Sequence, residues 1–253
     1  AFYGCSDLAS IEISNSVTTI GGSAFEGCSR IKSIEIPNSV TSLGGTPFKD
    51  CSSLTSITLG NSVKEITRDM FKNIPQLTTV KLGSSIKEIP NNAFSYCSNL
   101  TSVVMTNSVK SIGDNAFYYC SNLASIEIPN SVTSIGSAAF YHSGLKSVTI
   151  PNSVTRIYDT AFGYSGLTSI EIPNSVTYWG GSEFTGCHEL TTIIIDDLVE
   201  KLGQMAFSYC ENIKDVYCYA ENPPSARIAF IGSNYSAATL HVPGSALESY
   251  RSA

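Results

Sequence analysis

The sequence predicts a mostly-β member of the α/β repeat class, a right-handed solenoid of 22–23-residue coils with a parallel sheet on its concave side and short strands and turns on its convex side. Three observations predict it. A phenylalanine recurs at a nearly fixed interval, a set of aliphatic residues recurs with it, and turn residues separate the apolar segments. Repeats of roughly 20 to 50 residues are typical of solenoids and related arrays.

The phenylalanines set the length of the repeat. They recur every 23 residues from Phe2 to Phe140, then after two steps of 22 residues at Phe162 and Phe184, and again every 23 residues to Phe230. In the two shorter coils one residue is missing from a turn, so that Tyr-Cys-Ser-Asn-Leu becomes His-Ser-Gly-Leu or Tyr-Ser-Gly-Leu. Because the columns on both sides continue, we expect a loop to absorb each deletion while the core stays in register.

A central coil shows what each repeat contains. Residues 123–128 end in alternating β-branched and polar residues, which predicts a short strand with Ile126 and Ile128 pointing inward. Pro-Asn-Ser at 129–131 predicts a turn, and residues 132–140 predict a second short strand, a glycine corner and one helical turn. A single coil cannot bury its own apolar face, so we expect the first strands to stack into one continuous parallel sheet.

The coil sequence L-x-x-I-x-I-P-x-S-V-x-x-I-G-x-x-A-F-x-x-C resembles the BspA-type leucine-rich repeat, which is found in surface proteins of bacteria and of some protists. The resemblance covers residues 1–219, interpreted as one leucine-rich-repeat solenoid domain, and residues 220–253 resemble the family's C-terminal ending, interpreted as a final coil and cap. The chain opens inside a repeat, so we expect a fragment or a mature form. The resemblance implies a cell-surface or secreted adhesin-like protein that contacts host or extracellular proteins.

The eight cysteines and three histidines are candidates for disulfide, metal-binding or catalytic roles. All eight cysteines occupy apolar columns, seven of them three residues after a repeat phenylalanine, so we expect all eight to be reduced and buried as small hydrophobes. Cys-x-x-Cys and Cys-His spacings are absent, so no metal site or other cofactor is expected. His142, His188 and His241 fall in different columns without a nucleophile or carboxylate at a motif spacing, so no catalytic residue is predicted.

The outward position of the first strand is the first candidate binding surface, called here the variable column. A nearly constant column of Ser and Thr precedes it by two residues, which allows close approach to the backbone. Its members in the proposed site are Lys81, Val104, Glu127, Thr149, Glu171, Ile194 and Tyr217. Nearer the N-terminus it holds Glu12 and Glu35, about 5 Å apart if coils stack like strands. That spacing suits a retaining glycosidase, but a solvated pair is the preferred interpretation.

Aromatic residues form the second candidate surface, called here the aromatic edge. They follow their repeat phenylalanine by one or two residues, where N-terminal coils have residues such as Gly4 and Gly27, which indicates exposure. Exposed tyrosines are enriched at interfaces; the alternative is simple ring-on-ring packing along the solenoid. Trp179 stands in a core column and is interpreted as a packing residue. The aromatic edge consists of Tyr96, Tyr118, Tyr119, Tyr141, His142, Tyr164 and Tyr209.

Composition limits the functional classes. The net charge is -6 without a basic block, so a nucleic-acid partner is not expected. Apolar runs are too short for membrane insertion of this segment. The leading hypothesis is a non-enzymatic scaffold that binds proteins, with self-association possible through an uncapped N-terminal coil. The alternatives are a polysaccharide-binding or polysaccharide-active solenoid, and a structural spacer in a longer surface protein.

Overall fold

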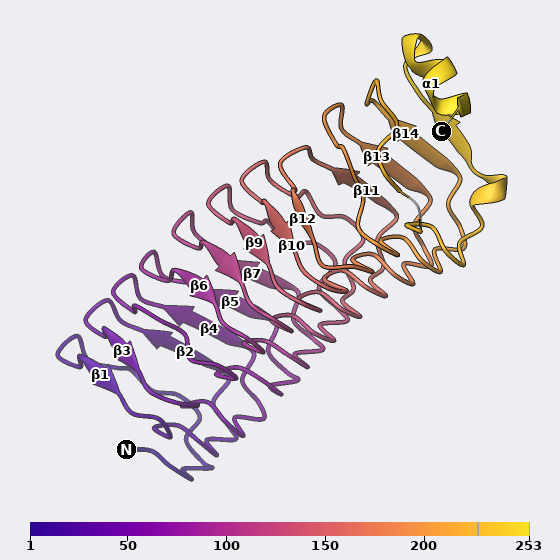
Figure 1. Ribbon diagram of the computed structural model, residues 1–253. Helices are drawn as coiled ribbons and strands as arrows, with labels where there is room; N and C mark the ends of the chain where they lie inside the picture. Colours follow the sequence, from indigo (N-terminus) through magenta and orange to yellow (C-terminus); the bar gives the residue numbers. More distant parts are fainter. Residues whose placement is uncertain (227, 253) are drawn as a thin grey trace.

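The computed structural model describes residues 1–226 and 228–252, which form a single stack of coils with the two termini at opposite ends (Figure 1). The strands are short and parallel. Helix in the described residues is confined to the C-terminal end, at η1 (Tyr235–Ala237), η2 (Gly244–Ala246) and α1 (Leu247–Ser252). The predicted mostly-β solenoid is confirmed.

The first strands of the coils form two sheets. Residues 124–128 and 146–150, between the two sheets, form no strand, so the expectation of one continuous sheet was wrong. The break adjoins the shortened turns at 143–144 and 165–166. There the first rung survives, as Lys146 N–H donates to the Ala124 carbonyl at 2.9 Å, but the ladder does not continue. Residues 124–128 follow a full-length turn and also leave the ladder, while β11 follows a shortened turn, so the missing residue alone does not account for the break. The sheets contain β2 (Ser33–Ile36), β4 (Ser56–Leu59), β5 (Thr79–Lys81) and β7 (Ser102–Val104), and β11 (Ser169–Ile172), β13 (Thr192–Ile195), β14 (Asp215–Cys218) and β15 (Thr239–His241).

The second strands are two residues long, as expected for a segment between a proline turn and a glycine corner. A five-stranded sheet of these strands runs through the coils in which the first sheet is broken, so each coil there keeps one ladder with its neighbours. The second strands are β1 (Thr19–Ile20) and β3 (Ser42–Leu43), and β6 (Glu88–Ile89), β8 (Ser111–Ile112), β9 (Ser134–Ile135), β10 (Arg156–Ile157) and β12 (Tyr178–Trp179).

The repeat phenylalanines stack along the whole solenoid. From Phe2 to Phe230 neighbouring ring centroids lie 5.1–6.1 Å apart and the rings are within 17° of parallel. The rings from Phe25 to Phe207 are buried. The backbone follows the same register, since Phe117 N–H donates to the Ala139 carbonyl at 2.7 Å. The stack passes through the 22-residue steps without a gap, which confirms that the core register survives both deletions.

The cysteine column is a hydrogen-bond ladder as well as a hydrophobic one. Thiols donate to the carbonyl of the phenylalanine in the preceding coil, for example Cys120 Sγ to Phe94 at 3.2 Å and Cys210 Sγ to Phe184 at 3.2 Å. These bonds satisfy buried carbonyls, which are costly to leave unpaired. All eight cysteines are free, and seven are buried. Cys5 is exposed, which corrects the expectation for that residue, because it lies in the outermost coil of the stack.

Replacing Phe117 by Ala should lower the free energy of unfolding by ~3–5 kcal/mol, because a fully buried ring is removed from the middle of the stack. Denaturant titration measures this change. Phe2→Ala is the matched control and should cost clearly less, because Phe2 is 37% exposed and has one stacking neighbour. A loss below ~1 kcal/mol for Phe117→Ala would contradict the role of the stack.

Thiol counting should find one fast-reacting cysteine in the native protein and eight after unfolding. Burial raises the pKa of the Cys97 thiol to about 12 and that of Cys187 to about 11, so almost no reactive thiolate forms in the core. Cys5→Ser should abolish the fast reaction. Two or more fast thiols, or fewer than eight after unfolding without reductant, would contradict the assignment.

Candidate functional site

The variable column lies on the exposed side of the first strands. Strand pairing aligns Lys81 with Val104, and Glu171 with Ile194 and Tyr217. Their neighbours in sequence, such as Val80 and Ile170, point into the core. The column members from Lys81 to Glu171 are exposed, and Ile194 and Tyr217 are half-buried. The structure therefore places the whole predicted column on one accessible face, while its binding role stays a prediction.

A groove interrupts this face where the sheet is broken. It has a volume of about 490 Å³, and three members of the variable column line it, namely Thr149, Glu171 and Ile194. Pro151 and Pro173 also line it. The variable column is thus hollowed between Thr149 and Ile194, and this position could not be located from the strand pattern.

The aromatic edge consists of two ladders and one separate tyrosine. In the outer ladder the rings of Tyr119 and His142 stack at 4.6 Å and those of His142 and Tyr164 at 5.0 Å, with Tyr96 at its N-terminal end. In the inner ladder Tyr118 stacks on Tyr141 at 5.4 Å. Exposure and ring-on-ring packing therefore both occur along this edge. The ring faces pack on one another, while Tyr96, Tyr119 and Tyr164 remain 37–46% exposed to solvent. Tyr209 stands apart and is 50% exposed.

The outer ladder occupies a strained backbone position. Tyr96, Tyr119, His142 and Tyr164 have φ between 51° and 63°, and Tyr209 has 57°. Glycine holds this position in other coils, for example Gly27 and Gly186. A bulky residue costs roughly 1 kcal/mol or more in the left-handed region. Stacking between the rings offsets that cost. The same positive φ occurs at Asp50 and Asn73, so the turn of the repeat requires it in coils without aromatic residues as well.

Glu183 is a candidate functional residue that the sequence analysis missed. It is fully buried and stands where other coils have Ala, Pro or Met. Its Oε1 accepts the Gly181 N–H at 2.6 Å, and its Oε2 has no hydrogen-bond partner. Burial raises the pKa of Glu183 to about 7, and the nearby Asp159 carboxylate adds to the increase. Comparing the alanine column residue by residue would have revealed it.

The same coil contains a second unpaired polar group. Trp179 occupies the core column of the second strands as predicted, packs against the core and is only half-buried. Its indole Nε1 is buried without a hydrogen-bond partner. The hollow beside it, about 770 Å³, is lined by Gly180, Lys201 and Gly203 among others. The coil that contains Trp179 and Glu183 is thus the least completely satisfied part of the core.

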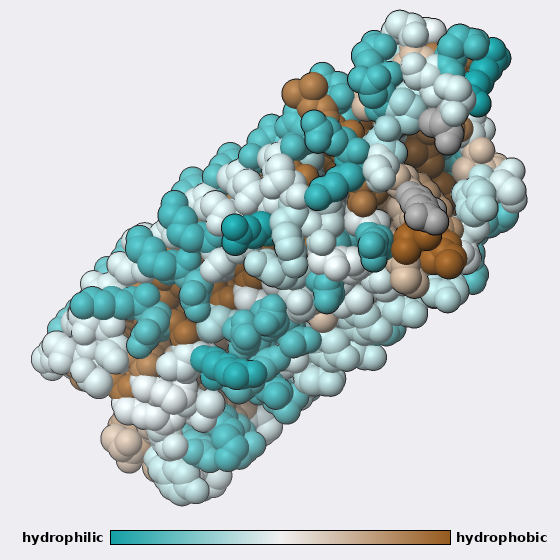
Figure 2. Space-filling view, in the orientation of Figure 1, coloured by the Kyte–Doolittle hydropathy of each residue, from teal (hydrophilic) through white to brown (hydrophobic). Residues whose placement is uncertain are grey.

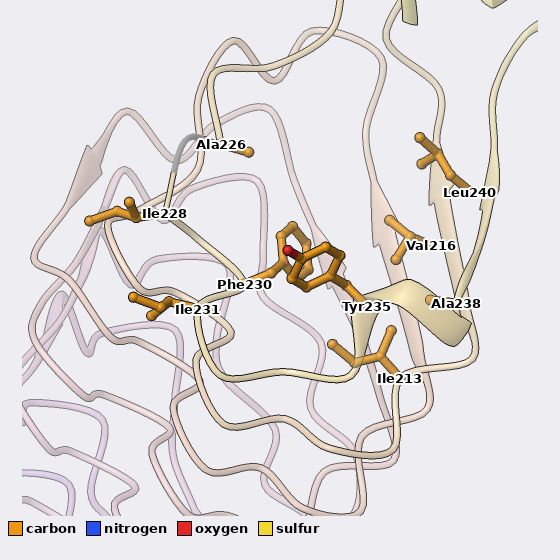
Figure 3. Close-up of a pocket in the computed structure, with 9 residues that line it drawn as sticks. All are labelled: Ile213, Val216, Ala226, Ile228, Phe230, Ile231, Tyr235, Ala238 and Leu240. Carbon is orange, nitrogen blue, oxygen red and sulfur yellow. The ribbon is translucent and has the colours of Figure 1, made fainter. Parts of the chain in front are cut away.

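An apolar hollow of about 610 Å³ lies in the last coil (Figure 3). Val216 and Leu240 line it from β14 and β15, and the rings of Phe230 and Tyr235 lie between these residues and the segment that carries Ile228 and Ile231. Hydrophobic residues also gather toward this end on a face that is otherwise mostly polar (Figure 2). The short helix α1 covers a neighbouring part of the coil, where Tyr250 Oη donates to the Ala220 carbonyl at 2.9 Å.

Among the other candidates for chemistry, His241 has a carboxylate partner, whereas no metal-binding group forms in the described residues. Residues 1–226 and 228–252 contain no group of three or more His, Cys, Asp or Glu that could hold a metal ion. Within the same ranges, no helix has the length and apolar character needed to cross a bilayer. Glu12 and Glu35 are both exposed, and His241 stacks on Tyr217 and contacts Asp215 Oδ1 at 2.8 Å.

The stability of the protein should fall as pH rises from about 4.5 through 7. Folding raises the pKa of Glu183, so the folded state favours the protonated form. The penalty is therefore absent below the unfolded pKa and complete above the folded one. Glu183→Ala should remove up to about 3 kcal/mol of destabilisation at pH 8 and little at pH 4.5.

Denaturant titrations of both proteins at the two pH values measure this difference. The exposed Glu211→Ala is the matched control and should show no comparable pH dependence. An equal effect of Glu183→Ala at both pH values would show that the carboxyl group does not titrate in this range.

Comparison with known proteins identifies the repeat. The family model of the BspA type leucine-rich repeat region matches the sequence over residues 1–101 and 87–214, in six copies. No curated protein matches the sequence.

Several solved structures share the fold. A leucine-rich repeat protein from Bacteroides ovatus is 26% identical, with a TM-score of 0.62 over 90% of this chain and 65% of that one. The T. pallidum leucine-rich repeat protein TpLRR is 22% identical, with a TM-score of 0.53 over 87% and 88% of the two chains. The pneumococcal vaccine antigen PcpA is 18% identical, with a TM-score of 0.51 over 92% and 67%. This chain thus spans about two thirds of the Bacteroides ovatus protein. With its repeat matched along most of its length, the chain belongs to the BspA-type leucine-rich repeat family.

Proposed function

We propose that this protein is a non-enzymatic interaction scaffold, displayed on a cell surface or secreted, that binds host or extracellular proteins in the manner of an adhesin. Family membership supports the scaffold role. That one structural relative is a vaccine antigen agrees with surface display. The proposed partners are proteins, and we propose neither a cofactor nor a nucleic-acid partner.

The contrast between constant and variable columns carries the proposal. Inward positions repeat nearly the same residue in every coil, while the exposed variable column changes from Lys81 through Glu127 and Thr149 to Ile194. Stacking sets the inward positions, but it places no demand on the outward ones. The groove at Thr149 and Glu171 gives this face a concave site, and exposed or half-buried aromatic rings give the neighbouring edge large, rigid side chains that lose little entropy on binding.

The rival functions predict different surfaces. A polysaccharide-active enzyme needs carboxylates on neighbouring coils at the groove, but Thr149 separates Glu127 from Glu171 in the variable column. A structural spacer needs no concave site at all. Self-association through the N-terminal coil is a further proposal, because Leu8, Ile11 and Ile13 are only partly buried there.

Binding to an array of extracellular-matrix and host-surface proteins tests the proposal, with surface plasmon resonance on each hit. We expect at least one saturable protein partner. Changing Tyr119, Tyr141 and Tyr164 together to Ser, or Glu127, Thr149 and Glu171 together to Ala, should weaken it roughly tenfold or more, as loss of hot-spot residues does. Melting temperature should change little in the second variant, because its residues are exposed.

Glu35→Ala with Thr58→Ala is the matched control, since both residues lie in the same column away from the groove. Binding that survives both triple variants would place the interface elsewhere. A protein that binds nothing on the array would favour the spacer function.

A further inference from the structure

The two consecutive shortened turns leave a hollow beside the aromatic edge, called here the notch. In 23-residue coils the residue before the conserved leucine has a polar side chain, such as Asn99 or Asn122, whereas the shortened coils have Gly144 and Gly166. Two neighbouring side chains are therefore missing from one row. The resulting space has a volume of about 360 Å³, which is within the range of small-molecule sites.

An ion pair bounds the notch on one side. Lys146 Nζ lies 2.6 Å from Glu189 Oε2, and the two residues belong to coils that are not adjacent. Lys146 reaches across the intervening coil to Glu189 because Gly166 has no side chain there. A Cβ at Gly166 would lie 3.1 Å from Lys146 Nζ. Both side chains remain about half exposed, so their remaining donors and acceptors are open to a ligand.

Aromatic rings bound the other side. His142 and Tyr164 stack at 5.0 Å, and His188 meets Tyr164 edge-on at 5.9 Å. The ring of Tyr164 rests on Gly186, where a Cβ would come within 2.5 Å of it. The glycine thus allows this ring to lie against the backbone of the next coil. The aromatic wall is fixed by packing on both sides.

The floor contains a polar group without a partner. Ser143 lines the notch and is 4% exposed, yet its Oγ makes no hydrogen bond. In other coils a cysteine at this position donates to a phenylalanine carbonyl, as Cys120 does to Phe94. A buried unpaired hydroxyl costs free energy, so the shortened coil leaves a polar group unsatisfied directly under the notch.

Charge indicates the class of ligand. Lys146 and Glu189 neutralise each other, and burial lowers the pKa of His142, which favours the uncharged imidazole at neutral pH. A charged ligand would therefore find a like charge as close as an opposite one. Neighbouring groups cover the ring faces of His142 and Tyr164, so the notch offers ring edges together with a paired donor and acceptor, which matches a molecule with C–H groups and vicinal hydroxyls.

We propose that the notch binds a neutral pyranose unit of a glycan, with C–H groups against His142 and Tyr164 and neighbouring hydroxyls bonded to Lys146 and Glu189. The ammonium donates to one hydroxyl oxygen, and the carboxylate accepts from the next. The notch shares His142 and Tyr164 with the aromatic edge, but Lys146 and Glu189 belong to neither surface assigned to a protein partner, so substitutions at these two residues test sugar binding separately.

Saturation-transfer NMR with neutral tetrasaccharides of glucose, mannose, galactose and N-acetylglucosamine tests the proposal, with tetragalacturonate as the acidic comparison. At least one neutral sugar should bind with millimolar affinity or better. Glu189→Gln and Lys146→Met should each weaken binding roughly tenfold, because each removes a charge-assisted hydrogen bond. Glu26→Gln is the matched control: it removes the Lys49–Glu26 pair, 2.7 Å between Nζ and Oε1 on two full-length coils, and should change nothing.

A second variant fills the notch while keeping Lys146 and Glu189. Replacing residues 142–144 by the Tyr-Cys-Ser-Asn of residues 119–122 restores a 23-residue coil. It should keep the melting temperature and abolish sugar binding. The proposal is overturned if no neutral sugar binds at about 10 mM, if binding survives Glu189→Gln together with the filled notch, or if the acidic sugar binds more tightly. Protein binding is measured separately with Glu189→Gln, which changes no residue of the aromatic edge or of the variable column.

Discussion

Each coil is stabilised by contact with its neighbours, and the phenylalanine stack is the contact that all of them share. The rings keep nearly the same separation through both shortened coils, and the backbone and thiol hydrogen bonds around them follow the same register. Stability in such a protein is approximately a sum of coil terms and nearest-neighbour terms. A residue in an inward column is therefore fixed by two neighbours, whereas an outward residue is fixed by neither.

This difference explains how much of the structure could be predicted. Coil length, buried columns and strand positions follow from the 23-residue period, because stacking requires the same residue type at the same place. The sheet break at residues 124–150 could not be predicted, because residues 124–128 and 146–150 keep the column pattern of the coils that do form strands. The exposure of Cys5 was missed for a related reason: its column is buried only where another coil covers it.

The candidate site was predicted less completely than the fold. The sequence identified the variable column and the aromatic edge, since each is a column whose residues change. It did not show that the outer-ladder residues and Tyr209 adopt positive φ, because Tyr and His rarely do so and only the glycines in the same column indicated it. Glu183 was missed because a single substitution in a column of Ala, Pro and Met is easily taken for a neutral change. In a stacked core the opposite holds, since a carboxyl group among alanines is desolvated and its pKa rises to about 7.

The departures from the repeat are concentrated between residues 142 and 203, and nearest-neighbour stability explains how the fold tolerates them. A shortened turn, a strained ring or a buried carboxyl group affects the adjoining coils directly and distant coils hardly at all. The Lys146–Glu189 pair is different, because it joins coils that do not touch through their backbones. It exists because Gly166 leaves the row between them empty. The deletion that removes two surface side chains thus both opens the notch and lets a cation and an anion meet across it. A solenoid can in this way form a local site where surface side chains are missing, while the stacking of its core residues continues unchanged.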